Sequence, residues 1–198
     1  MDGNRDGPPK LAEQRGVETV YEPAEDSQLL ADAVAERVGD GELLLDVGTG
    51  SGYVARRARK AGARVVGSDL NPHACEHARD MGVPVVLGNL TAPFRNGALD
   101  VVAFNPPYLP EPEGGGWGDW METAITGGED GREVIEPFLD DVGRVLAPGG
   151  RVYLLVSTMT GPDEVREYAA SRGLDAEEVA GESFRFERLL VLELTARE

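Results

Sequence analysis

The chain has 198 residues, which is enough for one domain with a sizeable hydrophobic core. Hydrophobic residues make up 41% of it, which excludes a disordered chain, and no apolar run approaches the roughly 18 residues that a membrane span needs. We therefore expect no membrane insertion. The formal net charge of −17 disfavours a large surface that binds phosphates, so we also expect no direct nucleic-acid binding.

The start of the chain and the rarer residue types indicate the cellular compartment and argue against some kinds of site. The start of the chain, MDGNRDGPPK, lacks the pattern of a signal peptide, which favours a cytoplasmic protein. Cys75 is the single cysteine, and His73 and His77 are too few for a metal site, so neither a disulfide nor a bound metal is expected. The basic residues are almost all arginine; this acidic, lysine-poor composition is typical of halophilic organisms, although any other acidic protein would share it.

Residues 1–16 are polar and contain several Gly and Pro, which predicts a disordered N-terminal segment. Residues 17–198 show no repeat and no linker, and we expect a single domain. Within it, residues 25–38 have helical spacing, with Asp26 or Ser27 as the expected cap. The apolar run 42–48 is a predicted buried strand.

Strands and helices alternate through the rest of the chain. Further strands are predicted at 63–69, 83–89, 97–105 and 151–157, and further helices at 53–62, 72–82, 131–150 and 161–173. Residues 174–194 are predicted to form two antiparallel strands, with alternation through Phe184, Phe186 and Leu190. The sum is an α/β fold: a doubly wound, seven-stranded, mostly parallel, Rossmann-like sheet.

A glycine-rich loop follows the first strand, in LLLDVGTGSGYVA. Gly48, Gly50 and Gly52 lie where a ligand can approach the backbone closely. A dinucleotide fingerprint requires its third glycine where Tyr53 stands, so the loop instead matches the G-x-G-x-G pattern of methyltransferases dependent on S-adenosylmethionine (AdoMet). A purely structural turn is the alternative.

Polar residues at the ends of three strands are candidate contacts of AdoMet. Asp46 precedes the glycine loop and is placed to meet the amino group of the methionine part. Asp69, 19 residues after Gly50, is placed to accept both ribose hydroxyls, unless it caps a helix. Asn89 is placed to accept the adenine amine, unless it only closes a turn. Leu70 and Leu90, which follow Asp69 and Asn89, complete the predicted cofactor site.

The fourth long strand ends in Asn105-Pro106-Pro107-Tyr108, a stiff segment that by itself would be only a rigid turn. An amide or aromatic NH₂ group is a poor nucleophile because its lone pair is delocalised. Two fixed acceptors, the Asn105 side-chain oxygen and the Pro106 carbonyl, would bind both hydrogens and direct that lone pair toward a methyl donor. Tyr108 would stack on the planar group. We expect these four residues to be catalytic, without a histidine base.

Five segments occur in the order typical of one family: VYEPAEDSQLL at 20–30, then LLLDVGTGSG, GSDLNP, NPPYLP and TAITGGEDGREVIEPFL at 123–139. Over 17–195 the chain therefore resembles the HemK-like protein-glutamine methyltransferases, in their short archaeal and eukaryotic form. The resemblance implies that Ser27 touches AdoMet and that Tyr21 to Asp26 cover it.

The resemblance also implies a substrate and a partner. Members of this family methylate the glutamine of a Gly-Gly-Gln motif in class I translation release factors. The short form pairs with a small zinc-binding activator subunit, which would add a strand beside residues 83–89, unless the N-terminal segment covers that edge. The alternatives are an adenine methyltransferase of DNA or RNA, a protein lysine methyltransferase, and an AdoMet-binding module without activity. The role of the Gly-rich loop 111–120, with Trp117 and Trp120, stays open.

Overall fold

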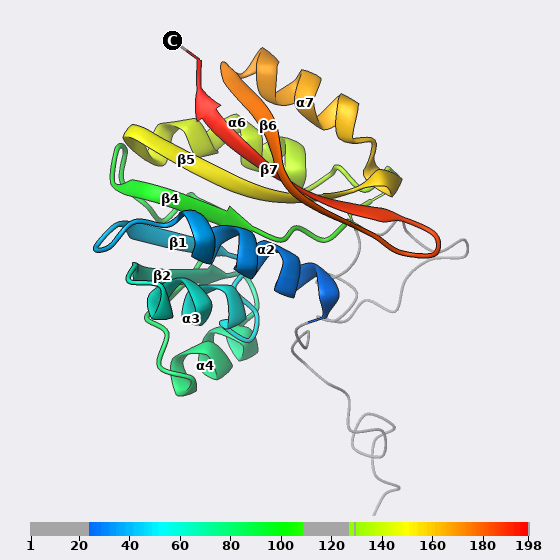
Figure 1. The fold of residues 1–198 in the computed structure, drawn as a ribbon. Helices are drawn as coiled ribbons and strands as arrows, with labels where there is room; N and C mark the ends of the chain where they lie inside the picture. Colours follow the sequence, from blue (N-terminus) through cyan, green and yellow to red (C-terminus); the bar gives the residue numbers. More distant parts are fainter. Residues whose placement is uncertain (1–23, 109–126, 129, 198) are drawn as a thin grey trace, which may run out of the picture.

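The computed structural model describes residues 24–108, 127–128 and 130–197, and these form one seven-stranded sheet with helices on both faces (Figure 1). The strands are β1 (Leu43–Val47), β2 (Arg64–Asp69), β3 (Val85–Leu87), β4 (Leu99–Phe104), β5 (Leu146–Ser157), β6 (Leu174–Ser183) and β7 (Arg188–Ala196). Their order across the sheet is β3-β2-β1-β4-β5-β7-β6. The predicted α/β fold is confirmed.

The sheet is parallel except for β7, which is the last strand in the chain. β1 pairs in parallel with β2 and β4, and β7 runs antiparallel to both β5 and β6, as the lack of a helix between the last two strands predicts. The strand order reverses between β1 and β4, and a ligand crevice is expected outside the carboxyl ends of such a strand pair.

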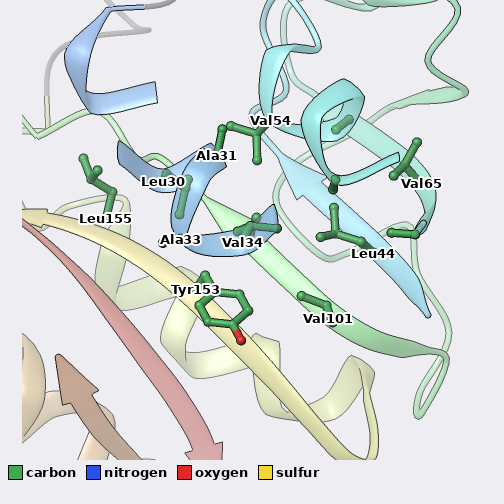
Figure 2. Close-up of a cluster of buried hydrophobic side chains, with 14 of the residues drawn as sticks. Leu30, Ala31, Ala33, Val34, Leu44, Val54, Val65, Val101, Tyr153 and Leu155 are labelled. Atoms are coloured by element: carbon green, nitrogen blue, oxygen red, sulfur yellow. The ribbon is translucent and has the colours of Figure 1, made fainter. Parts of the chain in front are cut away.

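The helices are α2 (Glu25–Arg37), α3 (Tyr53–Lys60), α4 (Pro72–Asp80), α6 (Ile135–Val145) and α7 (Pro162–Ser171), with a short 3₁₀ turn, η1 (Thr158–Thr160). Leu30 and Val34 of α2 lie in a buried cluster with Leu44 of β1, Val101 of β4 and Tyr153 of β5 (Figure 2). A second cluster forms beneath α6 and α7 on the other face. Because both faces are covered, the central strands β1 and β4 are mostly apolar.

Among the helices of the described residues, none is long and apolar enough to cross a membrane.

Three local predictions are wrong or need shorter bounds. α2 begins after Ala24, whose side chain makes no capping bond, so neither Asp26 nor Ser27 is the cap; both are buried within the first turn. β3 covers only Val85–Leu87, and its pairing with β2 ends where the N–H of Gly88 donates to the carbonyl of Asp69 at 2.9 Å. The alternation through Phe186 fails, since its side chain is 86% exposed in the turn between β6 and β7.

β5 is longer than predicted because it begins directly after α6. Leu146 already pairs with Leu99, and the register shifts before Arg151 pairs with Val101. The intervening Gly149 has a φ of +78°, which lets the strand continue through this irregularity.

An ion-pair network closes the amino end of the sheet. Arg151 of β5 donates to both carboxylate oxygens of Glu42, at 3.0 and 2.8 Å, and to the carbonyl of Arg37 at 2.8 Å. Its Nε donates to the Tyr153 hydroxyl at 2.9 Å. These bonds join the end of α2, the start of β1 and β5, and hydrogen bonding to Arg151 lowers the pKa of Glu42.

Candidate active site

The carboxyl ends of β1 and β4 lie side by side, because Val47 of β1 pairs with Phe104 of β4. The glycine loop follows Val47 and the Asn-Pro-Pro-Tyr segment follows Phe104, so the register alone makes the two neighbours. This is the strand pair at which the sheet order reverses, the usual position of a ligand site in such sheets.

The glycine loop has the backbone that its sequence predicts. Gly48, Gly50 and Gly52 have φ values of +60°, +52° and +74°, a region that residues with a Cβ rarely enter. A Cβ added at Gly52 would also lie 3.0 Å from Val83 Cγ2. The glycines are therefore required by the turn itself, and their backbone stays accessible to a ligand at Gly48, which is exposed.

Asp46 ends up beneath the loop. Its Oδ2 accepts from Thr49 Oγ1 at 2.8 Å and from the N–H of Ala55, in the first turn of α3, at 3.1 Å. Asp46 is 3% exposed, and desolvation raises its pKa to about 7 despite these bonds. The carboxylate fixes the loop, and its ionised form would gain from a cation brought into the site.

Asp69, at the end of β2, holds the same loop from the other side. Its Oδ2 accepts from the N–H of Gly50 at 3.0 Å and its Oδ1 from the N–H of Asn71 at 2.8 Å. Burial raises its pKa. Asp69 does not cap the next helix: Asn71 does, through a 2.9 Å bond from the N–H of His73. The motif LNP carries this capping signal, since Asn71 precedes a proline at the first helical position.

The residues after β2 and β3 line up at the same edge. Leu70 is 53% exposed and Asn89 is exposed, so both side chains are open to a ligand. Leu90 has a φ of +47°, and its carbonyl accepts from the Ser68 hydroxyl at 3.2 Å. The strained Leu90 backbone is thus held by a bond to the strand that carries Asp69.

The first turn of α2 lies against the Asn-Pro-Pro-Tyr segment. Asn105 Nδ2 donates to Ser27 Oγ at 3.3 Å, and the Tyr108 hydroxyl donates to Asp26 Oδ2 at 3.4 Å. Asn105 Oδ1 is buried and accepts no hydrogen bond from any residue that the structure describes. Pro106 is buried between these residues. The predicted contacts of Tyr21 lie outside the described residues, as do those of Trp117 and Trp120.

A glycine-rich segment backs the other side of the tetrapeptide. A Cβ on Gly127 would lie 2.6 Å from the Pro107 carbonyl oxygen, and one on Gly131 would lie 2.6 Å from that of Tyr108. Arg132 Nη1 donates to the Thr160 carbonyl of η1 at 2.8 Å. The sequence analysis named these glycines but not Arg132 or η1. The contact between Arg132 and Thr160 joins residues 28 apart in the sequence, and no local pattern indicates it.

The described residues thus form two half-sites. One has two desolvated carboxylates, Asp46 and Asp69, at a loop of accessible backbone, and the charge of Asp69 raises the pKa of Asp46 further. Such a half-site suits a ligand that carries positive charge and hydroxyl groups. The other has a buried acceptor, Asn105 Oδ1, next to a rigid proline pair. It suits a group that brings N–H donors.

The strand order with antiparallel β7, and the glycine loop after β1, define the chain as a class I methyltransferase fold. The family model described as a methyltransferase domain matches residues 45–106, from the middle of β1 to Pro106. This domain type implies dependence on AdoMet.

The comparisons with individual proteins narrow the class. A relative from Methanocaldococcus jannaschii, named for protein N5-glutamine methyltransferase activity, is 34% identical over 182 residues, which cover 87% of this chain and 90% of the relative. Methyltransferase HEMK2 of Homo sapiens is 34% identical over 195 residues, 89% of each chain. The solved Mtq2–Trm112 complex of E. cuniculi, responsible for methylating the termination factor eRF1, superposes with a TM-score of 0.77 at 31% identity, covering 91% of this chain and 100% of that chain.

The chain belongs to the family of short, HemK2/Mtq2-like protein N5-glutamine methyltransferases. It is therefore an enzyme of the methyltransferase class, and the predicted family is confirmed.

Proposed function

We propose that this enzyme transfers a methyl group from AdoMet to the side-chain amide nitrogen of the glutamine in the Gly-Gly-Gln motif of a class I release factor. The observation that carries the proposal is Asn105 Oδ1 at the end of β4, a buried acceptor without a hydrogen bond within residues 24–108, 127–128 and 130–197. A buried acceptor left unpaired costs about 1–3 kcal/mol, which a substrate N–H donor would offset. The relative that methylates eRF1 supports the choice of a release factor.

The tetrapeptide would prepare the nitrogen for transfer. Asn105 Oδ1 and the Pro106 carbonyl would each accept one N–H of the substrate NH₂ group, so that the nitrogen becomes more nearly tetrahedral and its lone pair is directed at the methyl donor. Tyr108 would pack on the plane of the amide and exclude water. AdoMet, when bound, supplies a methyl group on a sulfonium whose sulfur keeps the electron pair as the carbon–sulfur bond breaks. The methylated nitrogen then loses its extra proton to solvent, so no histidine is needed.

The carboxylates and the glycine loop would hold AdoMet. Asp46 would meet the ammonium of the methionine part, which compensates the desolvation that raises its pKa. Asp69 would accept the ribose hydroxyls beside Gly50, whose N–H it already binds. Asn89 would accept the adenine amine. Leu70 and Leu90 would pack on the adenine ring, and Ser27 and Tyr21 would complete the contacts that the family resemblance implies.

A zinc-binding activator subunit would pair with β3. This strand is the edge of the sheet, and four of the exposed large hydrophobic side chains lie on it or near it: Leu70 at 53%, Met81 at 43%, Val86 at 37% and Leu87 at 58% exposure. An apolar edge strand is a template for strand addition. The Trm112 subunit in the complex of the E. cuniculi relative supports this partner. Without it, we expect poor solubility or weak activity.

The main rival is an adenine methyltransferase, because an exocyclic amine fits the same two acceptors. The net charge of −17 disfavours it, since a nucleic-acid substrate needs cationic groups along its phosphates.

One labelling experiment separates the two. The enzyme, co-expressed with an activator subunit, is incubated with methyl-labelled AdoMet and either an archaeal-type release factor or total RNA and DNA. We expect label on the Gly-Gly-Gln peptide by mass spectrometry, and none on a factor whose glutamine is replaced by alanine. Label on adenine, or equal label on the altered factor, would refute the proposed substrate.

A further inference from the structure

Ser27 has a neighbour that its place in the sequence does not suggest. It is the third residue of α2, 8% exposed, and it is not the cap of the helix. Its hydroxyl oxygen accepts from Asn105 Nδ2 at 3.3 Å, across 78 residues of sequence. Serine inside a first turn usually serves the local backbone, whereas this hydroxyl contacts the side chain of the proposed catalytic residue.

This contact bears on a problem that every catalytic asparagine has. The two ends of a primary amide have nearly the same shape but opposite hydrogen-bonding character, since the oxygen accepts and the nitrogen donates. The proposed transfer needs the oxygen to face the substrate NH₂ group. A reversed Asn105 amide would present N–H donors to the substrate's own N–H donors, and binding of both hydrogens would be lost.

We propose that Ser27 is a positioning residue that fixes which end of the Asn105 amide faces the substrate. The hydroxyl accepts from Nδ2 and so holds the nitrogen toward α2, which leaves Oδ1 as a buried acceptor with no partner in the described part of the chain. This inference rests on the proposed role of Asn105. It differs from the contact with AdoMet that the family resemblance implies for Ser27, because it places the effect on the acceptor nitrogen and not on cofactor affinity.

The test uses the symmetry of a carboxylate. In Asn105→Asp, both side-chain oxygens accept hydrogen bonds, so the group has no wrong orientation. Ser27→Ala in the otherwise unchanged enzyme should lower kcat by roughly three- to tenfold, the size of one lost neutral hydrogen bond. The same change in the Asn105→Asp background should lower it less than twofold. Peptide affinity in the presence of S-adenosylhomocysteine gives the same comparison if the Asn105→Asp enzyme turns over slowly.

Two controls keep the interpretation specific. Gln28→Ala changes the next, exposed residue of the same helix turn and should leave kcat unchanged. Calorimetric AdoMet affinity is measured for Ser27→Ala in both backgrounds, and kcat is compared at saturating AdoMet. Any loss that comes from a Ser27 contact with AdoMet should be the same in both backgrounds, whereas the loss in kcat should not.

An equal loss in both backgrounds, a loss confined to AdoMet affinity, or no loss in either background would overturn the inference. The proposed function fails by a different result, namely no label on the glutamine with the unaltered enzyme. In that event the unaltered enzyme, Ser27→Ala, Asn105→Asp and the double variant are compared on the NH₂ group that carries the label. The failure of the proposed function and the failure of this inference are therefore distinguishable.

Discussion

The carboxylates at the two ends of the sheet have different partners, and their pKa values shift in opposite directions. At the amino end, Arg151 and Glu42 are joined by two hydrogen bonds, and the pKa of Glu42 is lowered. At the carboxyl end, Asp46 is buried and Asp69 is half-buried. Among the described residues both are bonded only to a hydroxyl and to backbone N–H groups, and their pKa values are raised. The Asn105 side-chain oxygen, also at this end, has no hydrogen-bond partner among the residues that the structure describes.

This contrast separates stability from function within one sheet. Paired charges at the amino end stabilise the fold, whereas the groups at the carboxyl end are held in place at a free-energy cost that a bound ligand would remove. Backbone strain is also found at the carboxyl end, where Leu90 is the one non-glycine residue with a positive φ among the described residues. Four predictions test the contrast, from the largest expected effect to the smallest.

Asn105→Ala should nearly abolish turnover, by about a hundredfold or more, because it removes a fixed acceptor that acts on the reacting group. Calorimetry should show that AdoMet still binds, since the contacts of Asp46 and Asp69 are untouched. Unchanged turnover in this variant would refute the role of the tetrapeptide.

The pH dependence of stability should reveal Asp46. Because its folded pKa is raised from 3.8 to about 7, the native chain binds a proton that the unfolded chain releases between these values. The free energy of unfolding of the cofactor-free protein should therefore fall as pH rises from about 4 to 7, by roughly 2–4 kcal/mol. Asp46→Asn cannot ionise, so its fall should be smaller in chemical denaturation. Parallel curves for the two proteins would contradict the desolvated carboxylate.

Gly131→Ala should disturb the backing of the tetrapeptide. Its φ is +74°, and the new Cβ would lie 2.5 Å from Thr160 Cγ2 and 2.6 Å from the Tyr108 carbonyl oxygen. Gly149→Ala is the matched control, with a φ of +78° and nothing within 4 Å. We expect Gly131→Ala to lose about 2 kcal/mol more than the control and to lose activity, while the control keeps it. Equal losses would mean that only backbone strain matters.

Glu42→Gln should weaken the amino end alone. It keeps the shape but removes the charge that Arg151 binds, and we expect a loss of about 1–2 kcal/mol in thermal unfolding with kcat unchanged. Glu36→Gln, in an ion pair whose glutamate side chain is 72% exposed, should change stability very little. A drop in kcat in Glu42→Gln would show that the two ends of the sheet are coupled.

Much of the candidate site could be predicted because it lies in short, continuous segments. The turn after β1 has a positive φ at Gly48, Gly50 and Gly52, a conformation that glycine adopts readily and other residues rarely do. The three glycines in the sequence therefore predict the conformation of the loop. The same holds for the stiff segment that begins at Asn105. Predictions failed where a residue had two possible partners: Asp26 and Ser27 are good caps in isolation, but their side chains bond to Tyr108 and Asn105 instead.

The sequence by itself determined the alternation of strands and helices, the positive-φ glycine turn after β1, and the rigid end of β4. Local steric preferences and periodic burial act over a few residues, so the amino-acid sequence alone is enough to predict them. Only the tertiary structure decided that Asp69 binds Gly50, that Ser27 binds Asn105, and that Phe186 extends into solvent. Such contacts depend on the register and packing of distant segments, which no local pattern specifies.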